Sequence, residues 1–321
     1  MTGQPIFNRL ALIGMGLIGS SIARAVRAQK AARSIVATAR SASTRRRVAE
    51  LGLADHVVET NTAAVEGADL VIVAVPVGAC SAVAAQIGPH LAAGAVVSDV
   101  GSVKGAVLRG MAPHIPPGVH FVPAHPVAGT ENSGPDSGFA ELFVNRWCIL
   151  TPPPGTDPKA IDRLASFWRL LGANVETMSA DHHDLVLGIT SHLPHLIAYT
   201  IVGTADELSQ VTRSEVLQFS AGGFRDFTRI AASDPTMWRD VFLANKDAVL
   251  EMLARFNEDL SKLTDAIERG DGDTLFQQFS RTRTIRRGIV EIGQDSPSPD
   301  FGRPHPALPH APLPRPYAAE D

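Results

Sequence analysis

The first half of the chain alternates short, continuous apolar runs with segments in which apolar residues recur at helical spacing. Continuous apolar runs are typical of strands that are buried on both faces of a parallel sheet. They predict strands at residues 7–13, 34–38, 69–75, 95–98, 119–122, 146–151 and 174–177, the last of which closes the sheet. Helices are predicted at residues 20–29, 79–87 and 158–171. Residues 1–178 are therefore predicted to form an α/β domain around a mostly parallel sheet.

From residue 179 onward the alternation of strands and helices stops. Apolar residues at helical spacing predict helices at residues 180–209, 215–219, 235–268 and 273–292. The second domain, residues 179–293, is thus predicted to be all-α and to build the other wall of a substrate cleft. Long apolar helices in so small a domain favour burial against a second copy of the chain, so we expect a homodimer. Residues 294–321 are rich in proline and are predicted to be a disordered tail.

Composition narrows the possible functions. The 321 residues carry a formal net charge of −4, which gives no reason to expect nucleic acid or an anionic membrane as a partner. Apolar runs such as residues 70–77 are too short to span a bilayer. The two cysteines, Cys80 and Cys148, lie in apolar surroundings, which fits a reducing cytoplasm and predicts neither disulfides nor a metal cluster.

A glycine-rich turn connects the first predicted strand to the first predicted helix. It consists of Gly14, Met15, Gly16, Leu17, Ile18 and Gly19. In this context the first glycine allows a tight turn, the second lets the backbone approach a pyrophosphate, and the third permits close packing of helix and strand. The start of the helix also offers free N–H groups to phosphates. We therefore predict a Rossmann-type domain that binds NAD(P)+ through these six residues.

The end of the second strand bears on which cofactor is bound. Sites selective for NAD usually carry an acidic residue about 20 positions after the turn, whereas this chain has Ala39, followed by Arg40 and Ser41. Arg40 and Ser41 can instead bind a 2′-phosphate through charge-assisted hydrogen bonds, which favours NADP+. The arginines at residues 45–47 either join that site or solvate the outer face of the next helix, and the sequence leaves both open.

Other candidates stand where ligands bind in open parallel sheets, at the carboxyl ends of strands. They are Pro76, Asp99, Ser102 and His125, of which Pro76 and Asp99 are assigned to the cofactor. Pro126 restrains His125 and small residues follow, so this imidazole is a candidate general base. Ser102 is a candidate ligand contact or, equally, the N-cap of the next helix. Lys104, in a first helical turn, is expected to be solvated, and Asp99 to order its loop.

The second domain contributes two clusters of polar residues. His192 and His195 lie three positions apart, on one face if the helix continues through Pro194. No third ligand accompanies them in the sequence, so substrate contact or internal packing is predicted rather than metal binding. Of two arginines four positions apart, Arg225 has acidic neighbours with which to pair, whereas Arg229 is expected to bind a ligand carboxylate.

Five motifs in this order resemble the prephenate/arogenate dehydrogenase family. They are LIGMGLIGSS at residues 12–21, DVGSVKG at 99–105, HPVAGTENSG at 125–134, SHLPH at 191–195 and GGFRDFTRIAASDPTMW at 222–238. The chain is most similar to the monofunctional bacterial, or cyclohexadienyl dehydrogenase, type. The resemblance implies that NAD(P)+ oxidises prephenate and/or arogenate with loss of CO2. The products are 4-hydroxyphenylpyruvate and/or tyrosine, in tyrosine biosynthesis.

The resemblance also implies roles for individual residues. His125 matches the histidine that accepts the proton of the substrate hydroxyl, and Ser102 matches a serine that places this hydroxyl. Arg229 matches the arginine that binds the ring carboxylate. The remaining predicted substrate contacts are His192, His195, Trp238 and Thr130.

The residues alone leave two other functions open. A β-hydroxyacid dehydrogenase combines a similar nucleotide-binding domain with a helical domain that supplies a lysine, for which Lys246 is the candidate. An NAD(P)-binding sensor without catalysis is the other, and the presence of His125 and Arg229 argues against it. No acidic residue near His192 and His195 would select the amine of arogenate, so both substrates are expected.

Overall fold

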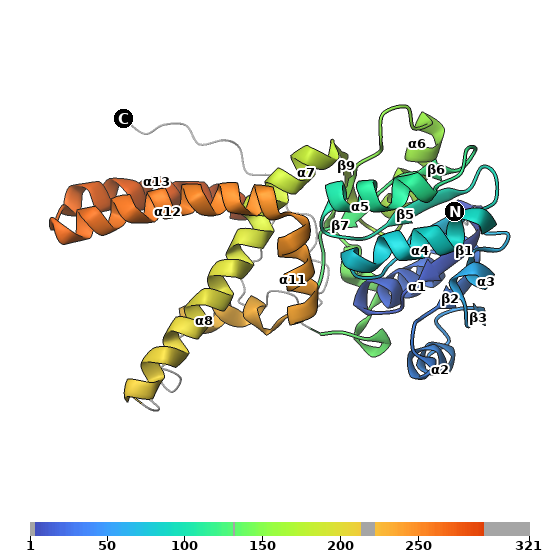
Figure 1. The fold of residues 1–321 in the computed structure, drawn as a ribbon, viewed down its shortest axis with the longest axis horizontal. Helices are drawn as coiled ribbons and strands as arrows, with labels where there is room; N and C mark the ends of the chain where they lie inside the picture. The colour runs from blue at the N-terminus through green and yellow to red at the C-terminus, as the bar shows by residue number, and fades with distance from the viewer. Residues whose placement is uncertain (1–3, 131, 213–221, 292–321) are drawn as a thin grey trace.

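The computed structural model describes residues 4–130, 132–212 and 222–291. An α/β domain is formed by the first half of the chain, and the long helices of the second half project away from it on one side (Figure 1). The helix predicted at residues 215–219, residue 292 and the tail at residues 294–321 lie outside the described residues.

A parallel sheet of six strands, in the order β3-β2-β1-β4-β5-β6, forms the centre of the first domain. Its strands are β1 (Phe7–Ile13), β2 (Ala32–Thr38), β3 (His56–Val57), β4 (Leu70–Val73), β5 (Val96–Asp99) and β6 (His120–Phe121). The helices of this domain are α1 (Leu17–Gln29), α2 (Ala42–Glu50), α3 (Asn61–Val65), α4 (Cys80–Ile87), α5 (Lys104–Met111) and α6 (Pro158–Leu170). Short helical turns are η1 (Val77–Ala79), η2 (Gly88–His90), η3 (Ala112–His114), η4 (Pro135–Ser137) and η5 (Ala140–Phe143). The strand order reverses between β1 and β4, the point where ligands bind in such sheets. The predicted Rossmann-type architecture is confirmed.

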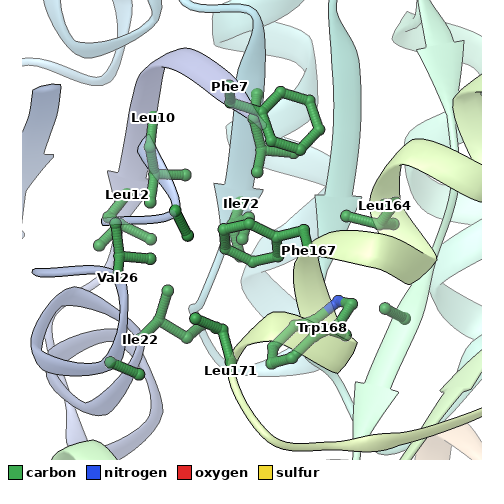
Figure 2. Close-up of a cluster of buried hydrophobic side chains, with 14 of the residues drawn as sticks. Phe7, Leu10, Leu12, Ile22, Val26, Ile72, Leu164, Phe167, Trp168 and Leu171 are labelled. Carbon is green, nitrogen blue, oxygen red and sulfur yellow. The ribbon is translucent and has the colours of Figure 1, made fainter. Parts of the chain in front are cut away.

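The two faces of β1 contribute to two separate hydrophobic cores, because successive strand residues point to opposite sides of a sheet. Leu10 and Leu12 belong to the cluster that includes Phe167 of α6, next to residues of α1 (Figure 2). Ala11 and Ile13 belong to the cluster on the other face, with residues of α4 and α5. The continuous apolar run of β1 therefore reflects burial on both sides.

A second sheet carries the histidine predicted as general base. It consists of β7 (Ala124–Pro126), antiparallel to β8 (Trp147–Leu150), which is parallel to β9 (Asn174–Thr177). The prediction that residues 174–177 close the main sheet is wrong, because β9 pairs with β8. His125 lies within β7, opposite Ile149, rather than at the end of β6. Apolar runs identified these strands but could not identify their partners, since pairing depends on contacts distant in sequence.

Helices form the described part of the second domain. They are α7 (Ala180–Leu187), η6 (Gly188–His192), α8 (Leu193–Thr212), α10 (Gly222–Thr228), η7 (Arg229–Ala232), α11 (Pro235–Ala244), α12 (Lys246–Glu268) and α13 (Gly272–Glu291). η6 is a π-helical turn, in which the Leu193 N–H bonds the Gly188 carbonyl, and the helix continues through Pro194. The single helix predicted at residues 235–268 is wrong, because α11 and α12 meet at Asn245, whose φ of −108° and ψ of 31° are not helical.

One stretch of this domain, Ala180–Glu207, is long and apolar enough to cross a membrane by length and composition. From the sequence, the apolar runs of this chain were expected to be too short to span a bilayer, and by length and composition this helical stretch is an exception. The same stretch carries Asp184, whose carboxylate bonds two backbone N–H groups of the first domain. Its N-terminal part is therefore packed against that domain.

Candidate active site

Three polar side chains, His125 of β7 and the consecutive His183 and Asp184 of α7, form a chain of hydrogen bonds. His125 Nδ1 lies 2.8 Å from His183 Nε2, and His183 Nδ1 lies 2.8 Å from Asp184 Oδ1. Because a carboxylate only accepts, His183 carries its hydrogen on Nδ1, and its Nε2 accepts from His125 Nδ1–H when both rings are neutral. His125 Nε2 then keeps its lone pair, as a general base requires.

Asp184 also caps α5, the helix that follows Ser102. Its Oδ1 accepts from the Lys104 N–H at 2.7 Å and its Oδ2 accepts from the Gly105 N–H at 2.8 Å. The N-cap position is occupied by Val103, without a side-chain cap. Of the two roles considered for Ser102, N-capping is therefore wrong. A carboxylate from the second domain satisfies these N–H groups and complements the helix dipole.

Lys104 is fully buried, so the expectation that it is solvated is wrong. Its Nζ lies 2.5 Å from Asp99 Oδ2 and donates to the Ala124 carbonyl at 2.7 Å. Asp99, also fully buried, accepts from the Gly101 N–H at 2.7 Å and from the Ala124 N–H at 3.3 Å. The ion pair therefore holds both backbone groups of the residue before His125. The carboxylate of Asp99, predicted to contact the cofactor, is engaged in this internal network.

Asn245, at the break between α11 and α12, positions His192. Its Nδ2 donates to the Asp184 carbonyl at 2.8 Å and lies 3.0 Å from His192 Nδ1. His192 Nδ1 therefore accepts, and its hydrogen is on Nε2. Within the described residues this Nε2 is buried without a hydrogen bond of ordinary geometry, and the Ser102 backbone is near enough to raise the pKa of the ring against the effect of burial. A buried donor that is poorly satisfied is costly, which makes Nε2 a suitable contact for a ligand acceptor.

Trp238 joins the remaining predicted substrate contacts. Its ring stacks on His195, with centroids 3.6 Å apart, and meets His192 edge-on at 6.0 Å. It also packs in one buried cluster with Val103, immediately after Ser102. The positive charge of Arg229 acts on His195, as the pKa of His195 described below reflects. The structure thus gathers residues of β7, α5, α8, η7 and α11 at one junction of the two domains.

Burial keeps the histidines of this site neutral. Burial, reinforced by the charges of His183, Lys104 and His192, holds the pKa of His125 well below its ordinary value. Burial also lowers the pKa of His183, against the opposing effect of Asp184. The pKa values of His192 and His195 are each lowered to about 4, mainly by burial. A neutral His125 is the form that can accept a proton.

The glycine-rich turn has the shape that a dinucleotide requires. Gly14 has φ of +98°, and a Cβ there would lie 2.3 Å from the Ala74 carbonyl oxygen. A Cβ on Gly19 would lie 2.1 Å from the Gly14 carbonyl oxygen, whereas nothing lies within 4 Å of one on Gly16. Of the three remaining residues, Met15 is buried in the turn, and Leu17 and Ile18 are the first two residues of α1. The turn thus fits a bound NAD(P)+, with open space where the backbone would approach its pyrophosphate.

The end of β2 presents arginines and hydroxyl groups. Arg40 and Ser41 are exposed, and the Ser41 hydroxyl caps α2 by accepting from the Thr44 N–H at 3.0 Å. Arg45 folds back to this place, since its Nη1 donates to the Ala39 carbonyl at 2.9 Å and to the Arg40 carbonyl at 3.2 Å. Of the arginines at residues 45–47, one therefore lies beside the predicted 2′-phosphate position. Arg47 instead pairs with Asp136 and Glu50.

Two predicted contacts lie at the rim of this region. Pro76 is exposed after β4 and is the N-cap residue of η1. The Thr130 hydroxyl accepts from the Asn132 N–H at 3.2 Å, in the segment that leads from His125 back to α1. That segment is joined to α1 by the Phe139 N–H, which bonds the Ser21 hydroxyl.

Sequence reasoning missed three residues of the site: His183, Asp184 and Asn245. The sequence did carry a signal, a run of Asp, His, His and Asp at the start of the second domain. Which of two adjacent histidines is buried depends on the docking of α7, and His182 is exposed whereas His183 is not. Lys246, the candidate of the β-hydroxyacid alternative, is exposed at the start of α12.

Two family models match the chain. The model described as "Prephenate dehydrogenase, nucleotide-binding domain" matches residues 22–177, and "Prephenate dehydrogenase, dimerization domain" matches residues 179–281. Cyclohexadienyl dehydrogenase of Zymomonas mobilis is 43% identical, over 88% of this chain and 97% of the relative. Prephenate dehydrogenase of Bacillus subtilis is 32% identical, over 88% and 76%.

A solved structure of prephenate dehydrogenase from A. aeolicus, in complex with hydroxyphenyl propionate and NAD+, is also similar. It has a TM-score of 0.82 and 32% identity, over 88% of this chain and 98% of that one. Fold, glycine-rich turn and buried histidine together define an NAD(P)-dependent oxidoreductase of the Rossmann type. With these matches, the chain belongs to the prephenate dehydrogenase family.

Proposed function

We propose that this protein oxidises prephenate and/or arogenate with NAD(P)+ and decarboxylates it, giving 4-hydroxyphenylpyruvate and/or tyrosine for tyrosine biosynthesis. The observation that carries the proposal is the buried His125, whose Nδ1 is occupied by His183 so that Nε2 is left as the base. Family membership and the relatives' names support this reaction class.

Each residue at the domain junction has a separate role in the proposed reaction. NAD(P)+, when bound, supplies the hydride acceptor. His125 Nε2 accepts the proton of the ring hydroxyl, and Ser102 places that hydroxyl. Arg229 binds the ring carboxylate that leaves as CO2. The substrate side chain meets His192, His195, Trp238 and Thr130. Because loss of CO2 makes the ring aromatic, the protein mainly supplies positioning and one base.

The test is turnover of both substrates, followed as the absorbance of reduced nicotinamide. His125→Asn should lower kcat by about 100-fold or more, the usual share of general base catalysis, while NAD(P)+ binding measured by calorimetry stays unchanged. The exposed His182→Asn serves as a matched control and should keep wild-type activity. Full activity of His125→Asn, or no turnover of either substrate by the folded wild type, would refute the proposal.

We further propose that the cofactor is NADP+. The support is the group of Arg40, Ser41 and Arg45 at the end of β2, where Ala39 replaces the acidic residue of NAD sites. Arg40→Ala should lower kcat/KM for NADP+ by about 10- to 100-fold, the value of one charge-assisted hydrogen bond, and leave NAD+ unaffected. Arg46→Ala, an exposed arginine of the same helix, is the control. Equal losses with both cofactors would contradict this assignment.

Finally, we propose a cytoplasmic homodimer, joined through the helical domain and bound to neither membrane nor nucleic acid. The support is a set of exposed apolar side chains on the projecting helices: Ile201, Val202, Leu260, Ile267, Phe276, Phe279 and Ile285. Burial of such side chains against a second copy would remove them from water. Light scattering should give twice the chain mass, and Phe279→Glu should lower it. A monomeric wild type would refute the dimer.

A further inference from the structure

The hydrogen-bonded chain of His125, His183 and Asp184 joins the two domains. His125 belongs to β7 of the first domain, whereas His183 and Asp184 start the second. His183 is fully buried, so water cannot take its place as the partner of His125. Asp184 is held on three sides, by His183 and by the N–H groups of Lys104 and Gly105. These contacts give the carboxylate little freedom to turn away.

We propose that His183 and Asp184 are positioning residues that carry the substrate proton away from His125, an inference that rests on the proposed function. The substrate hydroxyl gives its proton to His125 Nε2, and the His125 Nδ1 proton passes to His183 Nε2. His183 becomes the imidazolium, with its Nδ1–H still donated to the Asp184 carboxylate. His125 gains one proton on Nε2 and gives up another from Nδ1, so the positive charge is transferred to His183. This transfer needs no oxidant or further reactant.

The charges around the two rings favour the proton on His183. Lys104, on α5, is a positive neighbour of both rings, whereas His192, on η6, is neutral, so a cation on His125 meets a positive charge without a carboxylate in contact. Asp99, also on the first domain, is already paired with Lys104. Of the two rings, only His183 is hydrogen-bonded to Asp184, and the hydrogen bonds of this carboxylate keep it ionised, since they lower its pKa against the opposing effect of burial. The carboxylate therefore stabilises the proton one ring away from the substrate.

Helix α7 provides its own controls, because Asp181 and His182 are exposed versions of Asp184 and His183. Gln in place of His183 can still accept from His125 Nδ1–H but cannot take a proton. His183→Gln should lower kcat by about 10- to 100-fold with little change in KM, and Asp184→Asn by a similar or larger factor. Asp184→Asn should also move the acidic limb of the kcat profile to lower pH, because the proton on His183 loses the carboxylate that stabilises it. His182→Gln and Asp181→Asn should change neither.

If His183 and Asp184 had only a structural role, their variants would have a lower folded fraction or a higher KM, but the acidic limb of the kcat profile would stay in place. This result would overturn the proposal. A second measurement needs no substrate, so it separates this inference from the proposed function. Nitrogen-15 NMR of the resting protein should find the hydrogen of both His125 and His183 on Nδ1. Hydrogen on Nε2 of His125 would overturn the chain of bonds, even if both substrates are turned over. Wild type with the expected tautomers but no turnover would refute the proposed function instead.

Discussion

Replacing Lys104 by Met should destabilise the protein far more than loss of an exposed lysine. Both partners of the Lys104–Asp99 pair have fully buried side chains. Met fills much of the volume of the lysine stem but leaves a carboxylate inside the protein, with only the Gly101 and Ala124 N–H groups as partners. Breaking a buried pair in this way costs about 3–5 kcal/mol, a large part of the roughly 5–15 kcal/mol by which proteins are stable.

Urea unfolding, followed by circular dichroism, measures this loss as a lower midpoint at unchanged slope. The control is Lys262→Met, which breaks an exposed pair with Asp259 at 2.8 Å and should leave the midpoint almost unchanged. The double variant Lys104→Met with Asp99→Asn should recover much of the loss, because no buried charge is left. A midpoint for Lys104→Met equal to that of Lys262→Met would refute the reasoning.

The remaining predictions concern pH and the glycine-rich turn. Because the pKa of His125 lies well below its ordinary value, kcat/KM should stay on its plateau as the pH falls through about 6.5; an acidic limb at that pH would contradict this. His192 has a pKa of about 4 in the folded protein, lower than in the unfolded chain. As the pH falls, the unfolded chain therefore takes up this proton before the folded protein does. The free energy of unfolding should therefore fall as the pH drops from about 6.5 to 4, and less so in His192→Gln. Gly19→Ala should weaken NAD(P)+ binding and stability together, because its Cβ would overlap the Gly14 carbonyl; unchanged binding in calorimetry would show that the turn can adjust.

The first domain was largely predictable because its signals are local. A continuous apolar run such as residues 7–13 indicates a buried strand, and the glycine-rich turn after it needs only neighbouring residues to be recognised. His125 could be singled out for a similar reason, since Pro126 and the small residues after it act within one segment. The order of the motifs along the chain then sufficed to indicate the family.

Strand partners, burial and helix breaks needed the folded chain. Residues 174–177 form a strand as expected, but their pairing with β8 follows from a chain path that no local pattern records. Lys104 looks like a surface lysine in the sequence, and only the buried carboxylate of Asp99 explains its place. His182 and His183 are indistinguishable as neighbours in the sequence, yet the docking of α7 buries one and exposes the other.

The sequence by itself therefore determined the kind of protein, its α/β first half and helical second half, and the histidine at the centre of the candidate site. The tertiary structure decided what surrounds that histidine: the partner His183, the anchored Asp184 and the buried pair behind β7. The physical reason is that tautomer, charge state and pKa depend on which groups are brought within hydrogen-bond distance. Those groups come from positions nearly 60 residues apart, as His125 and His183 do.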